Sequence, residues 1–177
     1  MKTLVLRCPV ANYLNFLMWL LGREEDMTNI DGESGQPKAK YGIHCNYRVS
    51  GSWSKSTHQE RRPVYISAPE GDSSYGIVLG SSDEPVSPSD YKLKSKIEHS
   101  DTGLYYGETS TNLTEVEKPV YHVIRTFENK SSSDIHIREA GLIIKDSDNK
   151  KFLLFRDIVD VTLSPGEILT VDMFITV

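Results

Sequence analysis

The side chains that could do chemistry are few and scattered in this 177-residue chain. No metal-ligand spacing and no HExxH pattern occurs among its histidines, which are His44, His58, His99, His122 and His136. His122 and His136 fall on neighbouring predicted strands, so their rings could meet across a sheet; two partly exposed strand histidines are the more ordinary arrangement. His44 beside Cys45 would need distant partners to bind a metal. The histidines therefore predict no metal centre.

The carboxylates form no evident acid–base pair either. Glu139 is the notable one, because it shares the face of a predicted strand with Ile135 and Ile137. A carboxylate on an inward face needs a cation, so we expect Glu139 to pair with Arg125 or Arg156, unless that face is exposed.

Other sequence signatures of chemistry are missing or incomplete. The stretch DSDNK at Asp146 lacks the glycine and the distal glutamate of a calcium loop, and it fits a hairpin turn better. Nucleophile-elbow, phosphate-loop and dinucleotide signatures do not occur. Cys8 and Cys45 are interpreted as free thiols, with pairing as the alternative. We therefore expect no enzyme and no cofactor.

The clearest elements are strands in the last third of the chain. Alternating and continuous apolar patterns, separated by Asn, Asp, Ser, Pro and Gly turns, predict strands over 120–129, 134–146, 151–163 and 167–177. Four strands with short antiparallel connections make a meander or half of a sandwich. We therefore predict an all-β fold, an antiparallel β-sandwich over residues 27–177, preceded by an N-terminal α-helix.

The middle of the chain has weaker signals. Residues 41–49 and 61–68 resemble short strands, and YGIVLG at 75–80 predicts a buried strand bounded by glycines. The polar stretch 51–60 predicts an exposed loop or hairpin tip, and Trp53 next to such residues suggests a contact with a partner.

Residues 1–26 predict an apolar helix for docking or oligomerisation, with Pro9 suited to its start and Gly22 to its end. Its apolar residues extend beyond one stripe, so burial on several sides is favoured, by the β domain alone or also by a neighbouring subunit. The off-stripe residues expected to contact partners are Leu14, Met18 and Trp19. The apolar run is too short to span a membrane and lacks a signal-peptide cleavage site.

The stretch GSSDEPVSPSDYKL, residues 80–93, predicts an ordered strap that crosses from one sheet edge to the other. Pro85 and Pro88 restrict the backbone and lower the entropy cost of ordering it. Asp90 can accept hydrogen bonds from nearby amides. Tyr91 and Leu93 would point the same way in an extended segment and cover one apolar face.

Three segments together resemble virion structural proteins of tailed bacteriophages and related viruses. They are YGIVLGSSDEPVSPSDYKLKSKI at 75–97, IRTFENKSSSDIHIREAGLI at 124–143, and LLFRDIVDVTLSPGEILTVDMFITV at 153–177. The resemblance implies a capsid-, tail- or fibre-associated β-sandwich but assigns no definite role. It also implies a location in the virion, and in the host cytoplasm during assembly.

Two hypotheses about function follow. The first is a non-enzymatic assembly or decoration protein that binds copies of itself and the major capsid or tail proteins. The alternative is a receptor- or carbohydrate-binding protein of a fibre or tail tip, with Trp53, Tyr105 and Tyr106 as a stacking platform, unless one tyrosine packs inward. The net charge of -5 argues against nucleic acid as a partner.

Overall fold

A computed structural model describes residues 2–4, 26–35, 48–49, 52–53, 64–114 and 120–176. This part of the chain is all-β: its strands form two main sheets and two small hairpins, and it contains no helix. No helix in these ranges is long and apolar enough to cross a membrane.

The first main sheet, called the β8 sheet, has the strand order β1-β11-β8-β7. Its strands pair antiparallel except β1, which lies parallel to β11. The bounds are β1 (Lys2–Leu4), β7 (Leu104–Thr114), β8 (Val120–Asn129) and β11 (Ile168–Thr176).

The second main sheet, called the β9 sheet, has the order β10-β9-β6 and is antiparallel throughout. Its strands are β6 (Gly76–Gly80), β9 (Ile135–Lys145) and β10 (Lys151–Leu163). The small hairpins are β2 (Met27–Thr28) with β3 (Ser34–Gly35), and β4 (Arg48–Val49) with β5 (Ser52–Trp53).

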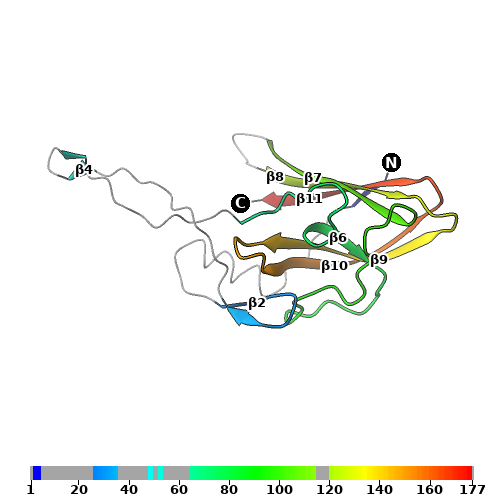
Figure 1. Ribbon diagram of the computed structural model, residues 1–177, viewed down its shortest axis with the longest axis horizontal. Helices are drawn as coiled ribbons and strands as arrows, with labels where there is room; N and C mark the ends of the chain where they lie inside the picture. Colours follow the sequence, from blue (N-terminus) through cyan, green and yellow to red (C-terminus); the bar gives the residue numbers. More distant parts are fainter. Residues whose placement is uncertain are drawn as a thin grey trace.

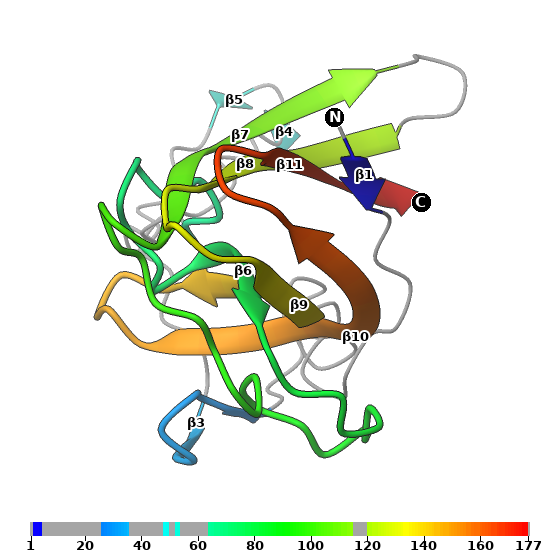
Figure 2. The ribbon, with the colours of Figure 1, turned by 90° about the vertical axis from the view of Figure 1, so that its right-hand side faces the viewer.

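The two main sheets face each other in both ribbon views (Figures 1 and 2). Alternation along β8 turns Val123, Arg125 and Phe127 inward, where all three are fully buried. Strand β9 is buried continuously from Glu139 to Ile144. A strand buried on both faces needs a second cover, which residues 81–97 and the β2–β3 hairpin provide on the side away from β8 (Figure 2).

The prediction that the last four strands lie in one sheet, as a meander or as half of a sandwich, is wrong. β8 and β9 follow each other in the chain but belong to different sheets, and β10 and β11 are separated in the same way. Turn residues encode a change of direction but not which strands pair. His122 and His136 therefore do not meet: His122 contacts Asp172 at 3.1 Å, and His136 contacts Thr162 at 3.0 Å.

Other predictions in the middle of the chain have mixed outcomes. The buried strand at 75–80 is confirmed as β6, in which every residue is buried. The strand predicted at 61–68 is wrong where it can be followed, since only Tyr65 forms a bridge, to Lys145. Strand β7 was not predicted at all.

Several predictions lie outside the described residues. Within segment 1–26, the structure describes only residues 2–4 and Asp26. Residues 2–4 form a strand rather than part of a helix. The helix around Leu14, Met18 and Trp19, and the cysteines Cys8 and Cys45, fall in the undescribed part. Only the backbone of Trp53 is described, and it lies in β5.

Candidate functional site

Residues 81–97, called the clamped loop, form a closed loop over the β9 sheet. The chain leaves β6 at Gly80 and returns to the end of the same strand, where Gly80 bridges Lys96. Ser81 donates its amide to the Ser95 carbonyl at 2.8 Å, and Ile97 donates to the Leu79 carbonyl at 2.9 Å. The segment 80–93 therefore does not cross between sheet edges as predicted; the chain reaches β7 only after the loop has closed.

A tight turn at Ser87–Asp90 brings a carboxylate under the loop. Asp90 donates its amide to the Ser87 carbonyl at 3.0 Å, and its own carboxylate accepts the Ser87 amide at 2.9 Å. Pro88 follows Ser87, at the position where proline favours a type I or II turn. Asp90 is thereby held at 5% exposure, although Pro85 and Pro88 beside it are exposed.

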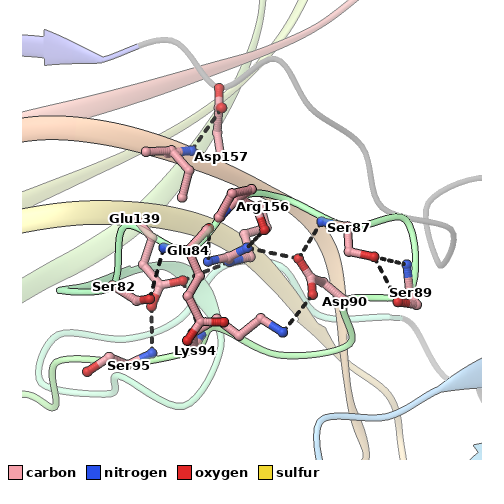
Figure 3. A network of polar contacts seen from close by, with 12 residues as sticks. Ser82, Glu84, Ser87, Ser89, Asp90, Lys94, Ser95, Glu139, Arg156 and Asp157 are labelled. Carbon is pink, nitrogen blue, oxygen red and sulfur yellow. Dashed lines mark hydrogen bonds and ion pairs between the residues drawn. The ribbon is translucent and has the colours of Figure 1, made fainter.

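The guanidinium of Arg156, from β10, lies between two buried carboxylates (Figure 3). Its Nε donates to Glu139 on β9 at 2.7 Å, and its Nη1 donates to Asp90 at 2.8 Å. The remaining donors reach the loop backbone, at the carbonyls of Pro85 (3.3 Å) and Glu84 (2.9 Å). The predicted pairing of Glu139 with Arg156 is confirmed, and the alternative partner Arg125 lies elsewhere.

Glu139 also holds the returning arm of the loop. Its two oxygens accept the amides of Lys94 at 3.1 Å and Ser95 at 2.6 Å. The Lys94 ammonium contacts Asp90 Oδ1 at 3.0 Å, while Asp90 Oδ2 accepts from Arg156 and from the Ser87 amide. One buried strand carboxylate and one buried loop carboxylate thus share a single guanidinium, and both have further donors.

Opposing effects act on the pKa of Asp90. Burial alone would raise it, but the Ser87 amide, Lys94 and Arg156 outweigh burial and hold it below the usual aspartate value. The network therefore keeps Asp90 ionised at neutral pH.

The apolar contact of the loop is made by Leu93, which is 5% exposed. Its Cδ1 lies against Gly141 on β9, where an added Cβ would be only 2.6 Å away. Tyr91 does not share this face: its ring is half-buried against Gly32 of the β2–β3 hairpin. The expectation that Tyr91 and Leu93 point the same way is wrong, because the chain between them is bent rather than extended.

A second buried guanidinium, that of Arg125, binds only main-chain oxygens among the described residues. It donates to carbonyls that surround the open edge of β6: Gly107, Tyr75, Ile77, Asp72 and Pro69, at 2.6–3.3 Å. Burial lowers the pKa of Arg125 to about 10, so the group stays charged at neutral pH. Sequence inspection suggested Arg125 as an ion-pair partner, and nothing in the pattern indicated this edge-sealing role.

The carboxylates of Asp90 and Glu139 are engaged by contacts within the fold. A general acid or base must present an oxygen to a substrate. The oxygens of Glu139 and Asp90 instead accept buried hydrogen bonds from their own fold. Within the described ranges, no three His, Cys, Asp or Glu side chains gather as a metal site.

The two tyrosines proposed for sugar stacking do not form an exposed platform, and the side chain of the third residue, Trp53, lies outside the described part of the structure. Tyr106 is fully buried, and its hydroxyl donates to the Ile97 carbonyl at 2.6 Å. Tyr105 is half-buried, with the Lys130 ammonium 3.2 Å from its ring centre and the His99 ring against it at 4.9 Å. One tyrosine of the pair packs inward, as strand alternation predicts.

Comparison with known proteins adds no relative: no family model, no curated protein and no solved structure matches the chain. Function must therefore be inferred from the residues of the chain itself.

Proposed function

We propose that this chain is a non-enzymatic virion structural protein that docks on the capsid or tail of a tailed virus. The observation that carries the proposal concerns the residues of the resembling segments. Arg125, Phe127, Asn129, Glu139 and Arg156 all lie in these segments and are fully buried. The residues on which the resemblance to virion proteins rests thus include groups that hold the fold together.

Asn129 illustrates how such a residue works. Its side-chain amide donates to the Ser133 carbonyl at 2.8 Å and to the Leu163 carbonyl at 2.7 Å. It therefore links the β8–β9 connection to the end of β10, which are two points where the chain passes from one main sheet to the other. A pattern made of such residues indicates a common scaffold rather than a common reaction.

The finer architecture belongs to the same proposal. Two facing sheets with one shared core support a β-sandwich. An N-terminal helix with Leu14, Met18 and Trp19, together with Trp53, would then supply the contacts with other subunits, since Trp and Met are frequent interface anchors. The protein would act in the virion, after assembly in the host cytoplasm.

The alternative of a carbohydrate-binding fibre protein is less well supported. Of its three proposed stacking residues, Tyr106 lies in the core and Tyr105 has a ring face occupied by Lys130. A glycan array would revive this alternative if it detected binding that Trp53→Ala abolished.

The proposal is tested by quantitative mass spectrometry of purified particles from the virus that encodes the chain. We expect the chain in a fixed ratio to the major capsid protein, and that ratio should persist through a second density-gradient purification. A chain found only in the particle-free fraction of the lysate would refute the proposal.

A further inference from the structure

Among the described residues, nothing covers the outer half of β7, which is a sheet edge. β7 is the last strand of the β8 sheet and runs along its upper rim in Figure 2. Its first half is covered, because Gly71 donates its amide to the Tyr106 carbonyl at 2.9 Å, and Thr109 donates to the Ala68 carbonyl at 2.8 Å. Beyond Thr109, the backbone of residues 110–114 pairs with β8 alone, as far as the described ranges extend.

Two other edges of the main sheets, those of β6 and β10, are protected among the described residues. Arg125 and Tyr106 cover the open side of β6 with side-chain hydrogen bonds. The outer half of β10 carries Asp157 and Asp160, and charged residues discourage edge pairing. Residues 109–114 of β7, TSTNLT, contain neither a charge nor a proline. An unprotected edge of this kind is a candidate for strand pairing.

The direction of the free main-chain groups follows from Thr109. Its amide points away from β8, since it binds Ala68. Main-chain groups alternate in direction along a strand, so Thr111 and Leu113 also present their N–H and C=O groups to the open side. The groups of Ser110 and Asn112 point toward β8. The side chains of residues 110–112 are exposed.

We propose that a second copy of this chain pairs with this edge, β7 against β7, antiparallel about a two-fold axis at Asn112. In this register Thr111 exchanges both main-chain bonds with the partner's Leu113, and Leu113 does so with the partner's Thr111. A register centred on Thr111 would need the Thr109 amide, which Ala68 already holds. The two Asn112 side chains then lie side by side on the exposed face, where their amides can bond each other.

A second copy fits this edge for two reasons. An antiparallel edge is complementary to itself, as a two-fold interface requires. The chain has a net charge of -5, which opposes self-association in general, but residues 109–114 bring no like charges together. The contact is short, so we expect a weak dimer with a Kd between about 10 µM and about 1 mM. This inference does not rest on the proposed viral role.

Sedimentation equilibrium of the full chain, up to about 2 mM, measures the association. Thr111→Pro removes an outward amide and leaves the bonds to β8 in place, as proline on an edge strand allows. Asn112→Lys places the ammonium groups of the two subunits opposite each other at the two-fold axis, where they repel. Each variant should weaken the dimer by about tenfold or more. Ser132→Lys, with the same charge change in an exposed turn, should leave the Kd unchanged.

Disulfide trapping tests the register independently. Residues at the axis form a non-hydrogen-bonded pair with Cα atoms about 4.5 Å apart, which suits a disulfide. Asn112→Cys should therefore give a 112-to-112 link under mild oxidation, whereas Ser132→Cys should not link. Peptide mass spectrometry separates this link from any that involves Cys8 or Cys45. A wild-type chain that stays monomeric at every concentration, a dimer that survives both edge substitutions, or a dimer that forms no 112-to-112 link would overturn the proposal.

Discussion

Leu93 of the clamped loop lies in the space that a side chain at position 141 would occupy. A Cβ on Gly141 would be 2.6 Å from Leu93 Cδ1 and 2.8 Å from the Phe155 carbonyl oxygen. Glycine at this position of β9 therefore lets the loop lie directly on the sheet. Leu93 and Gly141 are 48 positions apart in the sequence (141 − 93), and their sizes are complementary where the loop packs on the strand.

We predict that Gly141→Ala destabilises the protein by about 1–3 kcal/mol, because backbone on one side and Leu93 on the other leave no room for a methyl group. Urea unfolding measures the effect. In a Leu93→Ala background the same substitution should cost less, since part of the clash is removed. Equal costs in both backgrounds would show that Leu93 does not limit the space.

The ion pair between Arg156 and Glu139 should be strongly coupled. Arg156→Met alone leaves the buried Glu139 carboxylate without a cation and should cost about 3–5 kcal/mol. Glu139→Gln alone leaves Arg156 with Asp90 as its one carboxylate and should cost about 1–3 kcal/mol. The double variant should cost less than the sum, by about 0.5–3 kcal/mol. Glu108→Gln, at an exposed position of β7, serves as the control. Additive costs in the double-mutant cycle would contradict the pairing.

Asp90 should make the free energy of unfolding depend on pH in the acidic range. Its pKa is lower in the folded state than the unfolded value of about 4, so its ionised form adds stability above that pH. This contribution is lost as the pH falls through the lower folded pKa. The difference in unfolding free energy between the wild type and Asp90→Asn should therefore shrink as the pH is lowered from about 6 to about 2. A difference that stays constant over this range would be inconsistent with a depressed pKa.

Arg125→Lys should destabilise the protein although it keeps the positive charge. A lysine ammonium cannot reach the spread of carbonyls that the planar guanidinium binds, so several buried carbonyls lose their donor. We expect a loss of about 2 kcal/mol or more in urea unfolding. Arg138→Lys, at an exposed position of β9, should change stability by less than about 0.5 kcal/mol. Similar small effects at both positions would argue against the edge-sealing role.

Periodicity identified the strands whose two faces differ in polarity. β8 and β10 have the predicted bounds because apolar residues alternate or run continuously through them. β7 escaped detection because its outer half, TSTNLT, is almost entirely polar and its regular pairing is interrupted between Tyr106 and Thr109. Sheet membership could not be predicted, because it depends on where each turn leads the chain in space.

The candidate site was only partly predictable. A carboxylate on an inward strand face requires a cation, so the partner of Glu139 could be narrowed to two arginines. The role of Asp90 depends on a turn that buries it, and the role of Arg125 depends on an open strand edge formed by residues far away in the sequence. Neither follows from residue types at a fixed spacing.

The account depends most on the clamped loop being a fixed layer of the fold, and amide hydrogen exchange tests this directly. The amides of Lys94, Ser95 and Ile97 are bonded to Glu139 and Leu79, so we predict protection close to that of β6. The Ser132 amide, in an exposed turn, should exchange rapidly and serves as the reference. Exchange of the three loop amides as fast as that of Ser132 would contradict the account.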